Sequence, residues 1–271
     1  MFNDSTLERL MREAIHQSEG IIEPEKLENL TRLELNGWFI QDLTGLEYCH
    51  NLTYLDLSTN KITDISVLAG MIGMKELFLH NNNISDISPL SSMAELEILS
   101  LMSNPITDLS PLARSRSIRK VFLLNNQVSD VSPLAEMTGM THLSLSMNLI
   151  EDISPLSSLV NMKELGMNYN SIHSLSVIET MVNLTRLDAA NNRITDISPL
   201  TNLENLTWVD LSSNEISDLE PLSRYIPVEG QSFSIIIRDN PLSEISLSTY
   251  IPTMQDNGIN VEWQSLADLL K

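Results

Sequence analysis

Two aspartates of this chain, Asp188 and Asp210, have the residue type and the spacing for acid–base chemistry. They lie 22 residues apart in closely similar local sequences. If they occupy the same place on neighbouring strands, their carboxylates approach the separation found in retaining glycosidases. Three observations oppose that interpretation: Asp56 fills the same position in Leu-Asp-Leu, Arg186 can neutralise the pair, and a flat sheet offers no pocket that excludes water. We therefore predict that the chain is not an enzyme, with a glycoside hydrolase as a distant alternative.

Other residues that could hold a metal or a cofactor are poorly placed for it. His80 and His142 would lie roughly 14 Å apart on a regular sheet, which is too far to share a metal ion. An aspartate recurs once in most copies of a sequence repeat, and one carboxylate per copy supplies too few oxygens for calcium. Phosphate-binding and nucleophile-elbow sequences are lacking. Cys49 occupies an apolar position, so we expect a buried small residue. We predict no cofactor and no metal.

The elements that must position these residues follow from an internal repeat. Asparagine returns every 22 residues, at Asn60, Asn82, Asn104, Asn126, Asn148, Asn170, Asn192 and Asn214, with a ninth at Asn240. One copy reads Leu52-x-x-Leu55-x-Leu57-x-x-Asn60-x-Ile62-x-x-Ile65-x-x-Leu68. This pattern predicts one strand and one turn of a coil per copy, in a solenoid whose copies contact only their neighbours.

Each recurring position of the copy has a structural explanation. In Leu-x-Leu the two leucines alternate with exposed residues, as a strand requires. The Asn amide can satisfy backbone groups of the buried loop that follows the strand. Pairs such as Ser88-Pro89 are expected to act as N-cap and first residue of a short helical turn, and Asp86 can accept backbone N–H bonds in that turn.

The repeat leaves room for one α/β domain with a cap at each end. We predict an N-terminal helical cap at 1–29, with its helix over 4–16, and ten repeats at 30–242. A C-terminal α/β cap follows at 243–271, with a helix over 241–258 and a final strand at 259–263. The repeats form a curved solenoid with a parallel sheet on the concave face and turns and short 3-10 segments on the convex face. Trp38 replaces Asn in the first copy, where no earlier repeat exists to bond.

The segments Asn-x-Ile-x-Asp-Ile-Ser-Pro-Leu resemble bacterial leucine-rich repeats of the internalin type. The N-terminal segment 21–30 and the closing Asn240-Pro241-Leu242-Ser243 are similar to the flanks of such repeats. The same 22-residue class includes a eukaryotic regulatory subunit of protein phosphatase 1. The resemblance implies binding of another protein on the concave sheet and no catalysis. Internalins are exported and often carry an Ig-like domain and a wall-sorting motif, which this sequence lacks, so it does not support an invasion role.

The charge and the hydropathy of the chain limit which partners it can bind and where it can be located. With 16 basic and 36 acidic residues, the net charge is −20, which repels nucleic acid and anionic membranes. We expect a monomer and a partner with a basic rim. No apolar run is long enough to span a bilayer. The segment Met1-Phe2-Asn3-Asp4 does not begin a signal peptide, so a cytoplasmic location is expected for the sequence as it stands, and a cell-surface or secreted one if it was trimmed.

Candidate binding residues come from the positions that the repeat leaves free on the concave sheet. In copies three to five these positions are apolar: Phe78, Ile98, Met102, Phe122 and Leu124. They are flanked by Tyr54 and Met147 and rimmed by Asp56, Glu76, His80, Lys120 and His142. An exposed apolar patch on the order of a few hundred Å² usually marks an interaction site. The alternative is that neighbouring side chains merely cover one another.

A second group of candidate residues lies toward the C-terminal end and comprises Tyr169, Arg186, Asp188, Trp208 and Asp210. Within it, Arg186 and Trp208 are interpreted as a binding pair. The sequence therefore favours a non-catalytic protein–protein interaction module. A regulatory or inhibitory subunit of a cytoplasmic enzyme is a second form of the same function, and a structural spacer that binds nothing is the alternative.

Overall fold

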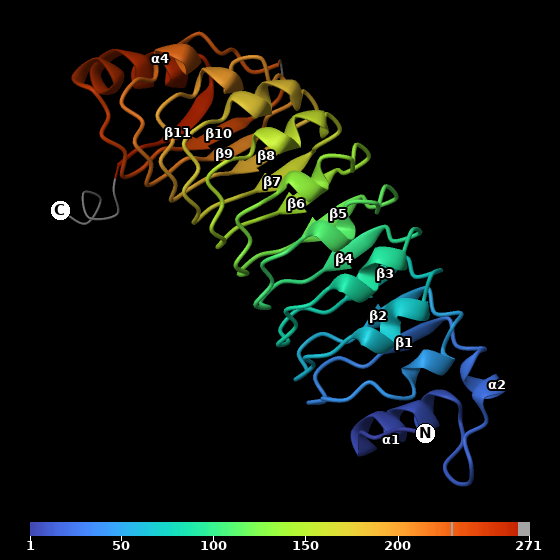
Figure 1. The fold of residues 1–271 in the computed structure, drawn as a ribbon. Helices are drawn as coiled ribbons and strands as arrows, with labels where there is room; N and C mark the ends of the chain where they lie inside the picture. Colours follow the sequence, from blue (N-terminus) through green and yellow to red (C-terminus); the bar gives the residue numbers. More distant parts are fainter. Residues whose placement is uncertain (229, 265–271) are drawn as a thin grey trace. The chain divides into compact units, whose positions relative to one another are not determined.

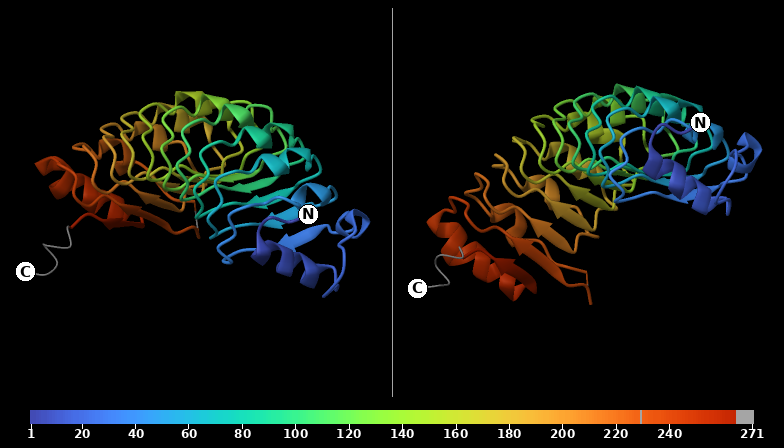
Figure 2. Two further views of the ribbon diagram at one scale, coloured as in Figure 1. Left: turned by 60° about the horizontal axis from the view of Figure 1, so that its bottom comes forward. Right: turned by 90° about the horizontal axis from the view of Figure 1, so that it is seen from below.

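The protein is built from two compact stacks of repeats. The computed structural model describes residues 1–228 and 230–264, and the chain divides into the units Met1–Gly139 and Met140–Lys271. In each unit the strands form one layer and the short helical turns form another (Figure 1), as two further views also show (Figure 2). This arrangement confirms the leucine-rich-repeat fold class. Part of the expected C-terminal cap, 265–271, lies outside the described residues.

The sheet of the first unit has parallel strands in chain order. They are β1 (Arg32–Glu34), β2 (Tyr54–Asp56), β3 (Glu76–Phe78), β4 (Ile98–Ser100) and β5 (Lys120–Phe122). Leu55 is in register with Leu33 on one side and with Leu77 on the other. The register therefore follows the 22-residue step of the sequence, and equivalent side chains form columns across the strands.

The sheet of the second unit follows the same rule. Its strands are β6 (His142–Ser144), β7 (Glu164–Gly166), β8 (Arg186–Asp188), β9 (Trp208–Asp210), β10 (Phe233–Ile236) and β11 (Ile259–Glu262). All neighbouring strands pair in parallel. Strand β11 confirms the final strand expected near residue 260.

Short helical turns connect each strand to the next. The 3-10 turns are Leu46–Tyr48, Ser66–Gly70, Ser88–Ser92, Ser110–Leu112, Ser132–Leu134, Ser154–Ser158, Ser176–Thr180 and Ser198–Leu200. The α-helices are α1 (Ser5–Ala14), α2 (Pro24–Leu27), α3 (Glu220–Ser223) and α4 (Ile251–Asp256). Among the described residues, none of these helices combines the length and the apolar composition needed to cross a membrane.

The core of each repeat consists of leucines and other aliphatic side chains, with an asparagine at its edge. Leu55 and Leu57 are fully buried. Asn126 donates from Nδ2 to the carbonyl oxygen of Leu123 in its own repeat and to that of Leu101 in the preceding one, both at 3.0 Å. Its Oδ1 accepts the N–H of Ile106 at 3.1 Å. Each asparagine thus ties a repeat to the one before it, so the first repeat can carry Trp38 at this position.

The helical turns are capped differently from the sequence prediction. The turn Ser88–Ser92 begins at Ser88 itself, with Ile87 at the N-cap position, and the Ser88 side chain does not cap it. Asp86 supplies the acceptor instead, because its Oδ1 receives the N–H of Ser88 at 2.8 Å. The predicted serine N-caps are therefore wrong. The predicted role of the aspartates is confirmed at Asp108, Asp130, Asp152 and Asp196 as well.

The two ends of the chain carry helices, as predicted. Asp4 caps α1, and the Leu7, Leu10 and Met11 side chains on the inner face of that helix are buried. Near the other end, a π-helical turn (Ser246–Tyr250) leads into α4, so the regular helix begins later than the sequence suggested. Gly45 has a φ of +107°, and a Cβ there would lie 2.2 Å from the Phe2 ring. Glycine therefore lets the Phe2 ring pack on the first repeat.

Candidate functional site

The apolar residues singled out in the sequence gather on the solvent side of the first unit's sheet. Ser100 is in register with Phe78 on β3 and with Phe122 on β5, and Ile98 lies between Glu76 and Lys120 in the neighbouring column. The main-chain bonding continues past the ends of β4 and β5, to the carbonyls of Met102 and Leu124, each two residues after its strand. We call Phe78, Ile98, Met102, Phe122 and Leu124 the sheet patch.

The side chains of the sheet patch are partly exposed and partly covered by their neighbours. The Tyr54 ring lies 5.5 Å from the Phe78 ring in a tilted arrangement, which is a favourable geometry for aromatic pairs. The guanidinium of Arg32 lies 3.4 Å from the centroid of the same Tyr54 ring. Tyr54 is therefore held between two neighbours, whereas Phe122 has no such stacking partner among the described residues.

The polar residues around the sheet patch differ in whether they already make hydrogen bonds within the protein. Asp56 accepts the N–H of Ser58 at 2.9 Å and its hydroxyl at 2.6 Å, so this carboxylate is part of a turn. His80 Nδ1 lies 3.3 Å from Ser100 Oγ. Glu76 and Lys120 are both half-exposed on either side of Ile98. A bound partner would thus meet charges of both signs close to the apolar centre.

The second unit's sheet presents a cation stacked on an aromatic ring. The guanidinium of Arg186 lies 3.5 Å from the centroid of the Trp208 ring, and the two residues are in register on β8 and β9. This contact is a cation–π interaction. It supports the pairing expected from the sequence, and it also means that one face of Trp208 is covered in the free protein.

The two aspartates beside this pair are held by hydrogen bonds. Asn168 Nδ2 donates to Asp188 Oδ2 at 2.8 Å. Asp210 accepts the N–H and the hydroxyl of Ser212, as Asp56 does from Ser58 in the first unit. Burial raises the pKa of Asp188, and the neighbouring Asp210 carboxylate acts in the same direction. The repetition of the Asp–Ser pair in both units supports a structural role for Asp210.

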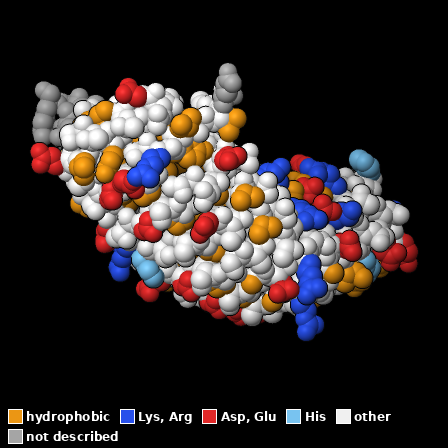
Figure 3. All heavy atoms as spheres, turned by 90° about the horizontal axis from the view of Figure 1, so that it is seen from above, with side chains coloured by type: hydrophobic (Ala, Val, Ile, Leu, Met, Phe, Trp, Pro, Cys, Tyr) orange, Lys and Arg blue, Asp and Glu red, His pale blue; other side chains and the backbone are white. Residues whose placement is uncertain are grey.

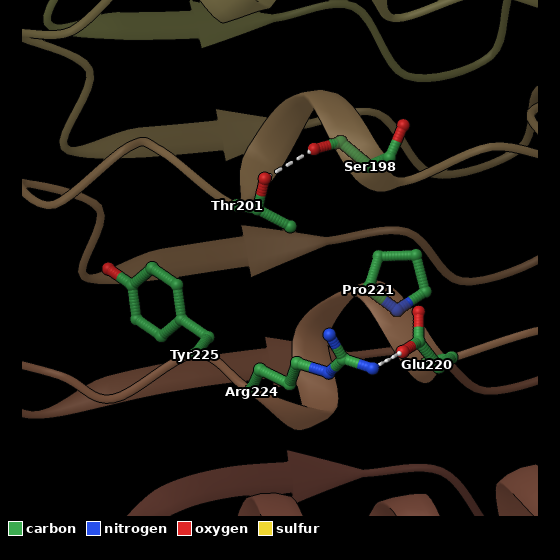
Figure 4. Close-up of a pocket in the computed structure, with 6 residues that line it drawn as sticks. All are labelled: Ser198, Thr201, Glu220, Pro221, Arg224 and Tyr225. Carbon is green, nitrogen blue, oxygen red and sulfur yellow. Dashed lines mark hydrogen bonds and ion pairs between the residues drawn. The ribbon is translucent and has the colours of Figure 1, made fainter.

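A hollow of about 380 Å³ lies on the helical-turn side of the second unit (Figure 4). Its polar side chains bond within their own turns or, at Tyr225, to the preceding repeat. Arg224 forms a 2.6 Å ion pair with Glu220, Thr201 Oγ1 donates to the Ser198 carbonyl at 2.8 Å, and the Tyr225 hydroxyl donates to the Leu203 carbonyl at 3.0 Å. These bonds stabilise the turns and do not combine a nucleophile with a base.

Two predicted binding residues lie beyond the sheet columns. Met147 and Tyr169 occupy the turn that follows each strand, directly before the repeat asparagine, and their φ angles are +56° and +53°. Both side chains are exposed. His142 stays on the sheet, where its Nε2 lies 3.6 Å from Glu164 Oε1.

The structure adds residues that the sequence interpretation missed. Ile236 is in register with Asp210, and Arg238 forms an ion pair with Glu262 at the end of the same sheet. The 26-residue spacing before Asn240 concealed this register. Leu149 is also exposed, two residues after Met147. The sequence could have revealed this, because most other copies carry polar or turn-forming residues at the equivalent position.

The surface charges and the lone cysteine bear on what chemistry the described residues could carry out. On the face drawn in Figure 3, hydrophobic side chains are scattered among acidic and basic ones. Within the described residues, no group of three or more His, Cys, Asp or Glu side chains could hold a metal ion. Burial raises the pKa of the Cys49 thiol to about 12, so this cysteine is a poor nucleophile at neutral pH.

Comparison with known proteins places the repeats in a family. A family model described as leucine-rich repeats (2 copies) matches residues 23–70, 73–114, 116–158 and 182–224. The structure of an internalin, InlF from Listeria monocytogenes, is 27% identical over 99% of this chain and 92% of that chain, with a TM-score of 0.76. Internalin C2 from the same organism is 30% identical over 83% and 90%, with a TM-score of 0.66.

A more distant likeness shows the fold alone. The plant peptide hormone receptor RGFR1, in complex with RGF2, is 20% identical and covers 81% of this chain and 41% of its own, with a TM-score of 0.62. No curated protein matches the sequence. On the family match and the internalin C2 likeness, the chain belongs to the leucine-rich-repeat family, with bacterial repeats of the internalin type.

Proposed function

We propose that this protein binds another protein through the sheet patch of its first unit. Proteins with leucine-rich repeats of this type act in protein–protein interaction. This proposal rests on the observation that Phe78, Ile98 and Phe122 face solvent from adjacent strands and are not part of the buried core. The two outer strands, β3 and β5, are two strand steps apart, roughly 10 Å, so a single segment of a partner can cover the whole patch.

The free energy of binding is expected to come from an apolar centre, with charged residues around it selecting the partner. Burial of apolar surface contributes roughly 25 cal/mol per Å² before the costs of association are subtracted. Methionine adapts its shape to a partner, and an aromatic ring can anchor one. Met102 and Phe122 are therefore suited to a protein interface. The net charge of −20 favours a partner that carries Lys or Arg around its apolar contacts, and salt should slow their encounter.

The test removes the Phe122 and Met102 side chains, which we expect to contribute most to binding at the sheet patch. A partner is captured from source-cell lysate with the wild-type protein, purified, and titrated against Phe122→Ser/Met102→Ser. We expect at least tenfold weaker binding. Because both side chains are only half-buried, the free energy of unfolding should fall by about 1–2 kcal/mol and the fold should persist.

The control is Ile72→Ser, which removes an exposed apolar side chain of the same unit away from the sheet. It should leave the affinity unchanged. Equal affinity of the double variant and the wild type would exclude the sheet patch as the binding site. Failure of the wild-type protein to capture any partner from lysate would favour the structural-spacer alternative.

A further inference from the structure

One backbone position recurs in the left-handed conformation throughout the chain. The residue directly before the repeat asparagine has a φ between +53° and +58° in nine copies. The residues are Thr59, Asn81, Ser103, Asn125, Met147, Tyr169, Asn191, Ser213 and Asp239. Asparagine and aspartate tolerate this region best among residues with a side chain, because their short polar groups can bond locally.

Five of these nine residues are neither Asn nor Asp, and two of the five, Met147 and Tyr169 in adjacent copies, carry large side chains. A bulky side chain at positive φ is strained, and such strain concentrates at sites where it serves a function. The turn itself does not need the size of either residue. Its bonds are made by the main chain, from Met147 N to the Asn168 carbonyl at 2.8 Å and from Tyr169 N to the Ala190 carbonyl at 3.0 Å.

Packing does not explain these two residues either. Met147 is 48% exposed, Tyr169 is 55% exposed, and the neighbouring Leu149 is 62% exposed. Phe39, another exposed aromatic residue at positive φ, has Lys61 Nζ 5.4 Å from its ring centroid. In the described part of the chain, neither a ring contact nor a side-chain hydrogen bond holds Tyr169. Three large apolar side chains therefore meet solvent where most copies carry polar ones.

We infer that Met147, Leu149 and Tyr169, here called the turn patch, form a second interaction surface for an extended protein segment that carries apolar side chains flanked by Lys or Arg. Met147 and Tyr169 stand on adjacent copies, roughly 4.8 Å apart along the stack. One apolar side chain of a partner can therefore touch both. Methionine adapts its shape to such a contact, and tyrosine offers a ring with a polar end.

The charges beside the turn patch determine which partner fits. Glu151 and Asp152 are exposed and follow Leu149 by two and three residues. Asp152 accepts the N–H and the hydroxyl of Ser154 and still presents its charge to solvent. A basic residue next to the apolar contact would be attracted to these carboxylates, and an acidic one would be repelled. The turn patch belongs to the second unit, so this proposal does not depend on the sheet patch.

The experiment uses a random peptide library displayed on phage. Peptides are selected on the wild-type protein and counter-selected on Met147→Asn/Tyr169→Asn, which installs the residue that Asn81, Asn125 and Asn191 supply at this position. We expect the surviving peptides to combine apolar residues with Lys or Arg. As synthetic peptides they should bind at least tenfold more weakly to this variant and to Leu149→Gln, and equally well to Phe122→Ser/Met102→Ser.

Stability supplies the second readout. The Met147→Asn/Tyr169→Asn variant should have a thermal midpoint equal to or above that of the wild type, because strain is relieved and no core contact is lost. Leu149→Gln installs the residue type that Gln127 supplies at the same position of another copy, and it should leave the midpoint unchanged. A lower midpoint in both would show that the residues are structural. The absence of any surviving peptide, or surviving peptides without basic and apolar residues, would overturn the proposal.

Discussion

On the first unit's sheet, Phe78 and Phe122 stand on either side of Ser100, whereas the same column of the second unit carries Gly166, Asp188 and Asp210. The second unit instead places large apolar side chains in its turns, at Met147 and Tyr169. Buried leucines and bridging asparagines are common to both units. Folding therefore does not require the difference between these side chains. The positions at which the two units differ are the ones that are free to determine what each unit binds.

The largest expected effect tests whether the two units share one stabilising framework. Asn126 and Asn192 make the same set of bonds, each donating to three carbonyls and accepting one N–H. Asn126→Leu and Asn192→Leu should each lower the free energy of unfolding by about 2–3 kcal/mol, because buried backbone groups lose their partners. Urea denaturation measures both. An unchanged midpoint for either variant would mean that the asparagine bonds contribute little in that unit.

A smaller effect comes from moving a residue of the second unit's turn into the first. Asn125→Met places methionine at a φ of +58° and removes the 3.2 Å bond from Asn125 Nδ2 to Ser103 Oγ. We expect a loss of about 1 kcal/mol. Asn125→Gly is the matched control and should lose less, since glycine adopts this conformation without strain. Equal stability of the Met variant and the wild type would remove the argument from strain at Met147 and Tyr169.

The smallest expected effects concern pH and have opposite signs in the two units. Burial raises the pKa of Asp188 in the folded protein, so its stabilising contribution is present below its usual pKa and is lost as the pH rises through the raised value. Hydrogen bonding from the Ser88 N–H lowers the pKa of Asp86. Its contribution is present above the usual pKa and is lost as the pH falls through the lowered value.

Two variants check these signs. Asp188→Asn should be more stable than the wild type at neutral pH, and Asp86→Asn should be less stable. Both differences should shrink at about pH 3, where aspartates become protonated. Urea midpoints at the two pH values measure the differences. A stabilising Asp86→Asn substitution would contradict the turn-capping role of that residue.

Much of this architecture could be predicted from the sequence because a strict repeat ties register to sequence number. Once Asn60 and Asn82 were aligned, Tyr54 had to lie beside Glu76, as it does. The composition of the sheet patch followed from the same alignment. Backbone conformation was also encoded, since Asn81, Asn125 and Asn191 share a position that turns out to be left-handed.

Side-chain contacts and capping were less predictable. Arg32 and Arg186 stack on Tyr54 and Trp208 because neighbouring strands bring a flexible cation over a ring, and the sequence alone leaves other rotamers open. The helical turns are capped by aspartates such as Asp86 and not by serine side chains. Both residue types favour N-caps, so only the backbone geometry distinguishes the two arrangements.

Photo-crosslinking tests the central claim most directly, that the sheet patch contacts the bound protein. A benzoylphenylalanine replaces Phe122 in one sample and the exposed Ile72 in another, and each is irradiated with the purified partner. We predict a covalent adduct from position 122 and none from position 72. An adduct from position 72 together with none from position 122 would contradict the proposed binding surface.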